Sequence, residues 1–376
     1  MSGRGVDQIL PTPSEPTLYE SFITDARDYV QLAERRNGPI PRDADFEYVW
    51  GAALDVWREY IPDLYVMNLE TSVTTHAQPW PEKGIHYRMH PANSRLLQVS
   101  GTDNVRHAAS GRLVDAEPDK GARQVCYSLA NNHVLDFGRD GLRETLQTLE
   151  SRGLSVCGAG RSAREASAAA RPEGTGADVF AVGIGNSGIP GEWKATDTRP
   201  GVHAFSRLNR STIDSEAARI RDELPARETG IVSVHWGGNW DWSVSKAERA
   251  FAHELIDNAG VSIVHGHSSH HMKGIELYHG ALILYGCGDF VSDYEGIPGH
   301  ESYRPDLSIM YFADIDPDTR TVESVRIVPL QSHRFSLRPV SASDLKWVEQ
   351  VFRRESEPFD TTVARTDSGE LVCDRL

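Results

Sequence analysis

Four histidines lie close together in the chain, at His265, His267, His270 and His271. Residues 261–264 before them are apolar or small, and three of them are β-branched, which predicts a short buried strand. Gly266 then permits a tight turn where that strand ends. Neutral imidazole is the commonest ligand for catalytic transition metals, and a loop at a strand end can direct several rings to one point. The pattern favours a metal site over its alternative, a histidine-rich surface loop.

Polar side chains also follow three other segments with the composition of strands. These segments are residues 63–69, followed by Glu70; residues 124–130, followed by Asn131 and Asn132; and residues 230–234, followed by His235. Strand ends carry the chemistry in many α/β enzymes, and carboxylate, amide and imidazole groups can all bind a metal. The alternatives are a solvated or helix-capping role for Glu70 and turn formation by the two asparagines.

His133 follows the two asparagines and could act as a proton donor. An imidazole beside a metal ligand can donate a proton to a leaving group. Asp136, three residues later, could orient that ring and raise its basicity. We therefore predict that His133 and Asp136 form a catalytic pair.

Two cationic residues lie in long loops that have no apolar periodicity. Arg88 belongs to the loop 75–95 and Lys194 to the Gly- and Pro-rich loop 186–200. A guanidinium group can hold an anionic group with two parallel hydrogen bonds. Both residues are predicted substrate contacts, and the alternative for each is a structural loop.

Strand-like and helix-like segments alternate up to about residue 290, which predicts an α/β architecture. Residues 308–315 and 321–329 look like an antiparallel pair, which makes the predicted sheet mixed. Helical spacing of apolar residues occurs at 19–36, 46–60, 141–151, 163–170, 212–223, 246–259 and 340–354. We expect one large domain at 1–335, and at 336–376 a C-terminal helix followed by a frayed, charged tail.

Composition excludes several functional classes. The chain has 376 residues, of which 39% are hydrophobic, and a formal charge of −15, so nucleic acid is not expected as its main partner. The four cysteines are far apart, which argues against a zinc ribbon or a disulfide framework. The longest apolar runs are too short to span a membrane, and the first twenty residues are too polar for a signal peptide. These features predict a cytoplasmic location.

Four short motifs, in this order along the chain, resemble those of the CapA family, the poly-γ-glutamate capsule biosynthesis proteins. They lie at residues 68–70, 130–133, 235–237 and 266–270. The resemblance covers most of residues 1–335. It implies a four-layer αββα sandwich with mixed sheets, like that of calcineurin-like metallophosphoesterases, and a site for two divalent metal ions at the strand ends.

The resemblance also implies roles for individual residues. Glu70 would bridge both metals, Asn132 and His235 would be ligands, and His133 would be the proton donor. His267 and His270 would be the ligands from the last motif. Ser268 occupies a position that is often histidine in the family, so the ligands among His265, His267, His270 and His271 stay open.

The start of the sequence departs from the family pattern. The family begins with a strand ending in Gly-Asp-x-Met, and residues 1–4 match the family's residues after that aspartate. We therefore expect an upstream start codon, with the first strand encoded before Met1. Reading the upstream DNA in frame tests this expectation.

The predicted function is that of a metal-dependent hydrolase. Two ions of Mn, Fe or Zn would activate a water for attack on a phosphoester or on a γ-glutamyl amide in poly-γ-glutamate or capsule biosynthesis. The alternative is a non-catalytic accessory protein of a capsule or poly-γ-glutamate assembly machine. The expected partners are a small anionic or γ-glutamyl substrate and capsule-synthesis proteins.

Overall fold

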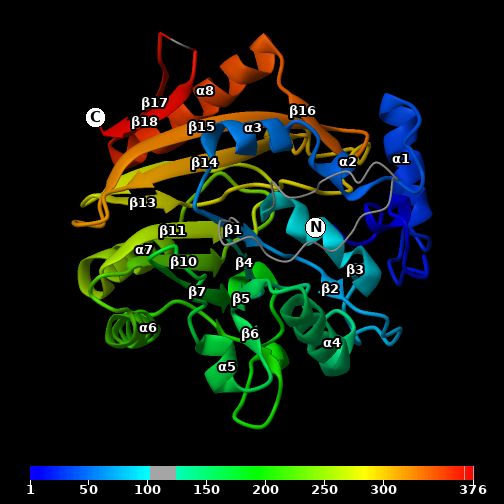
Figure 1. Ribbon diagram of the computed structural model, residues 1–376, viewed down its shortest axis with the longest axis horizontal. Helices are drawn as coiled ribbons and strands as arrows, with labels where there is room; N and C mark the ends of the chain where they lie inside the picture. The colour runs from blue at the N-terminus through cyan, green and yellow to red at the C-terminus, as the bar shows by residue number, and fades with distance from the viewer. Residues whose placement is uncertain (102–123, 368, 376) are drawn as a thin grey trace.

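The computed structural model describes residues 1–101, 124–367 and 369–375 (Figure 1). Its central feature is a six-stranded sheet with the order β12-β13-β11-β10-β7-β9. All neighbouring strands run parallel except β12, which pairs antiparallel with β13. The strands are β7 (Ala177–Ile184), β9 (Ala204–Phe205), β10 (Thr229–His235), β11 (Val261–His267), β12 (Ile275–Tyr278) and β13 (Ala281–Leu284).

Helices α6 (Arg210–Glu223) and α7 (Lys246–Ala259) cover one face of this sheet, at the lower left of Figure 1. Since side chains alternate along a strand, Val232 and Val264 pack against these helices, and Ile231 and Ile263 face the other way.

Sequence signals fix both ends of α7. Ser245 and Glu248 form a capping box at its start, and Gly260, with φ of 72°, ends it one residue before β11. The helix that carries the chain from β10 to β11 therefore has defined limits.

A second layer of strands faces the six-stranded sheet. Strands β1 (Leu64–Asn68), β4 (Gln124–Ser128) and β5 (Ser155–Cys157) form a parallel sheet in the order β1-β4-β5. The antiparallel sheet β14-β15-β18-β17, with β16 paired to β15, lies in the orange and red part of Figure 1. Its strands are β14 (Leu307–Ile315), β15 (Val322–His333), β16 (Ser336–Pro339), β17 (Thr361–Arg365) and β18 (Leu371–Arg375).

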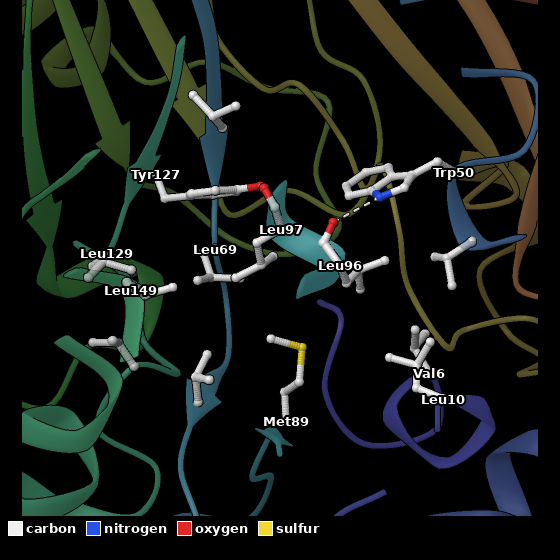
Figure 2. Packing of buried hydrophobic residues seen from close by; sticks show 14 of the residues in the cluster. Val6, Leu10, Trp50, Leu69, Met89, Leu96, Leu97, Tyr127, Leu129 and Leu149 are labelled. Carbon is white, nitrogen blue, oxygen red and sulfur yellow. Dashed lines mark hydrogen bonds between the residues drawn. The ribbon is translucent and has the colours of Figure 1, made fainter. Parts of the chain in front are cut away.

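The largest hydrophobic cluster lies on the outer side of this second layer (Figure 2). The indole nitrogen of Trp50 donates a hydrogen bond to the carbonyl of Leu96 at 3.0 Å. Leu69 and Leu129, which follow β1 and β4, pack in the same cluster. Burial of these leucines anchors the two strand ends from which Glu70 and Asn132 project.

Helices and short elements complete the fold. The helices are α1 (Arg27–Asn37), α2 (Phe46–Trp50), α3 (Ala53–Tyr60), α4 (Gly138–Ser151), α5 (Ala163–Ser167) and α8 (Ala342–Ser356). Besides β9, four further two-residue strands are β2 (Ser72–Val73), β3 (Arg88–Met89), β6 (Ala159–Gly160) and β8 (Gly201–Val202). Short 3-10 segments include η1 (Asp7–Ile9) and η2 (Pro91–Gly101). Within the described residues, every helix is too short or too polar to cross a lipid bilayer.

The α/β architecture and the antiparallel pair near the C-terminus are confirmed. The frayed tail is wrong, because β17 and β18 form a hairpin that extends the sheet from β15. Val363, Leu371 and Cys373 are buried there, and this period-two pattern was the signal for strands. The helix predicted from residue 19 begins only at Arg27, because Thr17 and Asp25 form a β-bridge before it.

Candidate functional site

The ends of β1, β4, β10 and β11 bring together the polar residues that the sequence singled out. His235, the last residue of β10, is fully buried. Its Nε2 atom lies 3.1 Å from Oδ1 of Asn132 and 4.0 Å from Oε1 of Glu70. Its Nδ1 atom lies 2.7 Å from Nδ1 of His267, the last residue of β11. Four of the five predicted metal ligands therefore form one cluster.

Asn131 holds the ends of β1 and β4 together. Its side-chain amide donates to the carbonyl of Leu69 at 2.8 Å and to Oδ1 of Asn68 at 3.0 Å. Its own Oδ1 accepts the backbone N–H of His133 at 3.0 Å. Asn131 is thus a structural tie, and its neighbour Asn132 is the asparagine that faces His235.

Ser233 orients two of the clustered histidines. Its hydroxyl lies 2.9 Å from Nε2 of His267 and 3.0 Å from Nδ1 of His265. His265 is two residues earlier on β11 than His267, so it points from the same face of the sheet. It lies one step further from the strand ends than His267 does.

The other two histidines of the segment 265–271 have different surroundings. His270 lies 3.0 Å from a carboxylate oxygen of Asp289 and 3.3 Å from the hydroxyl of Tyr294. Burial opposes a charge on His270, but Asp289 outweighs it and raises the His270 pKa. His271 bonds a backbone carbonyl and packs its ring against Trp242, which gives it a place in the core.

His133 and Asp136 form the predicted pair. Nδ1 of His133 lies 2.7 Å from Oδ2 of Asp136, which also accepts the backbone N–H of Tyr87 at 2.7 Å. Lys83 joins them, with its Nζ atom 3.0 Å from Nδ1 of His133 and in contact with the Asp136 carboxylate. With Nδ1 engaged in this way, Nε2 is the ring nitrogen that can exchange a proton with a substrate.

Burial dominates the electrostatics of this pair. It raises the pKa of Asp136 to about 6, although the charge of Lys83 acts in the opposite direction. It also lowers the pKa of His133, and the Lys83 charge adds to that effect. Burial lowers the pKa of His235, and the charges of His133 and His270 lower it further. His133 directly follows Asn132, whose Oδ1 lies 3.1 Å from His235, so the His133–Asp136 pair adjoins the cluster.

The donor types in the cluster fit a divalent cation. The carboxylate of Glu70, the amide oxygen of Asn132 and the imidazole of His235 are a mixed oxygen and nitrogen set. Burial raises the pKa of Glu70, and a bound cation would counteract that effect. Among the described residues, no three His, Cys, Asp or Glu side chains lie close enough together to hold a metal ion. A metal bound by Glu70 and His235 would therefore need Asn132 as a third donor.

Arg88 and Lys194 are placed differently from the cluster residues. Arg88 is buried, and its guanidinium donates to the carbonyls of His76 and Glu15 at 2.9 and 2.8 Å. Lys194 is exposed, with its ammonium 5.5 Å from the ring centre of Phe205. Their roles as substrate contacts remain predictions.

Sequence reasoning missed Lys83, Asp289 and Ser233. Lys83 lies in the Pro-containing loop 75–95, fifty positions before His133, and carried no local signal. Asp289 follows β13 closely and repeats the pattern of a polar residue after a buried strand. That repetition was the available signal for Asp289.

Comparison with known proteins decides the family. The family described as bacterial capsule synthesis protein PGA_cap matches residues 1–119 and 120–294. This chain belongs to that family. A probable polyglutamine synthesis accessory protein of Mycobacterium tuberculosis is 40% identical over 367 residues, which cover 96% of this chain and 90% of the relative.

More distant relatives carry the CapA name. The PGA biosynthesis protein CapA of Bacillus subtilis is 26% identical, over 65% of this chain and 60% of the relative. The capsule biosynthesis protein CapA of Bacillus anthracis is 24% identical, over 64% of this chain and 55% of the relative. The resemblance to the CapA family is thereby confirmed.

Proposed function

We propose that this PGA_cap family protein is a metal-dependent hydrolase that acts in poly-γ-glutamate or capsule biosynthesis. One observation carries the proposal. A histidine whose Nδ1 is held by Asp136 and Lys83 occupies the same buried site as the converging Glu70, Asn132 and His235. Ligand-type donors beside a positioned proton donor are the components of metal-assisted hydrolysis.

The fold supports the same proposal. Helices α6 and α7 cover a six-stranded sheet, a second layer of strands faces that sheet, and α3 and α4 pack outside the second layer. We assign this arrangement to the four-layer αββα sandwich of the metallophosphoesterase type. The cluster lies where strands of both layers end.

Each residue has a proposed task. Glu70, Asn132, His235 and His267 would hold one or two ions of Mn, Fe or Zn, with His270 as a further ligand. When bound, such ions lower the pKa of a water and polarise the substrate. His133 donates a proton from Nε2 to the leaving group, and Asp136 keeps its ring oriented. Burial excludes bulk water and strengthens these electrostatic interactions.

The proposed substrate is a γ-glutamyl amide or a phosphoester. The names of the relatives, which refer to PGA biosynthesis and to polyglutamine synthesis, favour the amide. The second candidate is a non-catalytic accessory role, which the name of the Mycobacterium tuberculosis relative favours. A catalytic proton donor separates the two candidates, because a scaffold does not need one.

The experiment compares His133→Ala with wild type on γ-glutamyl oligomers and on aryl phosphoesters, in the presence of Mn²⁺. We expect the substitution to lower turnover by about 10²- to 10⁴-fold, the usual contribution of general acid–base catalysis. Metal content should be unchanged, because His133 is not one of the proposed ligands. His279→Ala is the matched control, since His279 is an exposed histidine that also contacts an aspartate.

Two results would decide against the hydrolase. Wild-type protein that binds Mn²⁺ but hydrolyses neither substrate class would favour the accessory role. Full complementation of polymer synthesis by His133→Ala in cells would do the same.

A further inference from the structure

The hydroxyl of Tyr294 lies beside the candidate site, where it reaches His270. Its oxygen is 3.3 Å from Nε2 of His270, and the two rings pack edge to face with their centres 4.8 Å apart. Asp289 holds the other ring nitrogen of His270, Nδ1, at 3.0 and 3.2 Å. The orientation of His270 is therefore fixed, and its Nε2 faces the phenol.

A second tyrosine links this hydroxyl to the proton donor. The hydroxyl of Tyr87 donates to that of Tyr294 at 3.3 Å. The Tyr87 ring packs edge to face with that of His133, with ring centres 4.5 Å apart, and its backbone N–H donates to Asp136. Tyr294 is thus joined to His270 directly and to the His133–Asp136 pair through Tyr87.

A buried ion pair fixes the backbone next to Tyr294. Arg4 donates to both carboxylate oxygens of Asp293, each at 2.7 Å, and Asp293 is fully buried. The guanidinium carbon of Arg4 lies 4.4 Å from the ring centre of Tyr87 and 5.9 Å from that of Tyr294. Two parallel hydrogen bonds of this kind are geometrically specific, so Arg4 holds Asp293 and both phenol rings in one arrangement.

The hydroxyl of Tyr294 is held more loosely than its ring. Both of its contacts measure 3.3 Å, whereas a hydroxyl donor typically lies about 2.7 to 2.8 Å from an oxygen acceptor. The Tyr294 oxygen accepts from Tyr87, so its own proton is free to point toward His270. Tyr294 is also partly exposed, whereas Tyr87 is 1% exposed. A hydroxyl in this state can donate to an acceptor that enters the site.

The proposed function, in which His270 is a further ligand, supplies that acceptor. Nδ1 of His270 is engaged by Asp289, so Nε2 is the nitrogen that remains for a cation. A ring nitrogen that ligates a cation has no lone pair left to accept a hydrogen bond from Tyr294. The proton of the Tyr294 hydroxyl is then available to an oxygen of the substrate.

We infer that the Tyr294 hydroxyl donates a hydrogen bond to a tetrahedral oxyanion at the reacting centre of the substrate, and that Tyr87 aligns it. This inference rests on the proposed function. Both proposed substrate classes present such an oxyanion, as the phosphoryl group of a phosphoester or as the tetrahedral intermediate of amide hydrolysis. A donor in this position stabilises the negative charge on it. Tyr294 is then a catalytic residue, and Tyr87 is a positioning residue.

The first test measures the binding of inorganic phosphate, itself a tetrahedral oxyanion, to the Mn²⁺-loaded protein by calorimetry. We expect Tyr294→Phe to weaken phosphate binding by about 10- to 100-fold, the usual effect of losing a hydrogen bond to a charged group. Its Kd for Mn²⁺ should be unchanged, because the phenol is not one of the proposed ligands. Tyr303→Phe is the matched control, since Tyr303 is another partly exposed tyrosine between β13 and β14, and its hydroxyl donates to the carbonyl of Trp240.

The second test measures turnover of γ-glutamyl oligomers and aryl phosphoesters. We expect Tyr294→Phe to lower kcat by about 10²- to 10³-fold, as the loss of an oxyanion donor does. Tyr87→Phe keeps the ring against His133 and removes only the aligning hydroxyl, so its loss should be smaller. In the double variant, Tyr87→Phe should add nothing to the loss from Tyr294→Phe, because Tyr87 acts through Tyr294. Tyr303→Phe should match wild type.

The outcomes separate this inference from the hydrolase itself. Equal phosphate Kd values in Tyr294→Phe and wild type would overturn it, and so would an equal loss in Tyr303→Phe. A fall in Mn²⁺ affinity as large as the fall in phosphate affinity would assign Tyr294 to the support of His270 instead. Additive losses in the double variant would overturn the role of Tyr87.

Wild-type protein that binds phosphate but turns over neither substrate class would count against the hydrolase alone. The phosphate Kd values still decide the role of Tyr294 in that case. Wild-type protein that binds Mn²⁺ but no phosphate would overturn the inference, because an oxyanion would then have no place beside Tyr294.

Discussion

Two histidine–carboxylate pairs in this protein, each contacted by a Lys or Arg side chain, differ in the pKa of the carboxylate. The first is His133 and Asp136 with Lys83, in the candidate site. The second is His203 with Glu216 and Arg219, the last two on α6. Burial dominates the first and raises the pKa of Asp136 to about 6. Burial opposes ionisation of Glu216 too, but hydrogen bonds from His203 and Arg219 outweigh it and lower its pKa to about 2.

The difference agrees with the proposed roles, in which the first pair serves chemistry and the second serves stability. Arg219 gives Glu216 two hydrogen bonds, at 3.0 and 2.7 Å, that use both carboxylate oxygens. Lys83 contacts one oxygen of Asp136 and also reaches His133. A planar guanidinium satisfies a buried carboxylate more fully than an ammonium does. Asp136 therefore loses its charge at a higher pH than Glu216 does, which agrees with the proton-transfer role proposed for its pair.

The largest expected effect is on catalysis. Asp136→Asn should lower turnover by about 10²- to 10³-fold, because the His133 ring loses the carboxylate that orients it. Single-turnover rates with saturating Mn²⁺ measure this loss. Glu216→Gln, a change of the same kind in the other pair, is the control. A similar rate loss in both variants would mean that the comparison between chemistry and stability is wrong.

The next largest effect is on stability. Glu216→Gln should lower the free energy of unfolding at pH 7 by about 3 kcal/mol, because the pKa of Glu216 is depressed from its ordinary 4.5 to about 2. That contribution is present above about pH 4.5 and is lost as the pH falls toward 2. Urea unfolding at pH 7 and at about pH 3 measures it.

The stability contribution of Asp136 should depend on pH in the opposite direction to that of Glu216. Its raised pKa makes its contribution to stability fall as the pH rises from about 4 to about 6. The stability difference between wild type and Asp136→Asn should therefore shrink over that range, while the difference for Glu216→Gln is already constant. Slopes of the same sign in both variants would contradict the assignment.

Metal binding should change stability by a somewhat smaller amount. Only substitutions in the candidate site, and not those in the His203–Glu216 pair, should remove this change. Free Mn²⁺ at about 100 times its Kd should raise the free energy of unfolding of wild type by about 2.7 kcal/mol, and a chelator should reverse the rise. Glu70→Gln should remove most of it, because the amide brings no charge to the cation. Glu216→Gln should keep it. A full rise in Glu70→Gln would place the bound ion outside the cluster.

The smallest expected effect is a loss of stability from a substitution away from both pairs, and it serves as a control for them. Ser245→Ala removes the side-chain cap of α7 and should cost about 1 kcal/mol of stability. Its turnover and its response to Mn²⁺ should match wild type, as activity assays and thermal unfolding can show. A change in either would mean that α7 helps to position the end of β10 or β11.

The sequence was a good guide to residues at strand ends and a poor guide to their partners. His133 with Asp136 was predictable because three residues separate them and the strand before them is clearly apolar. Lys83 was not, because its contacts with the pair cross fifty residues and start in a loop without periodicity. Long-range contacts of this kind are decided by packing of the whole fold.

The same limit applied to the fold. Alternating α and β segments predicted the α/β architecture, because strands such as β7 and β10 are continuous apolar runs. β17 was missed, since only Thr361 and Val363 of its five residues are buried and Val363 is its one large apolar residue. The cavity that β1 and β14 border was not predicted, because it depends on two strands more than 230 residues apart.

The tie made by Asn131 has a practical consequence for redesign. One amide group links the end of β1 to the backbone of His133, so it couples the position of the Glu70 carboxylate to that of the His133 ring. A redesign of the loops around the cluster should therefore keep Asn131, and should also keep Ser187, whose hydroxyl donates to the carbonyl of His235 at 3.2 Å.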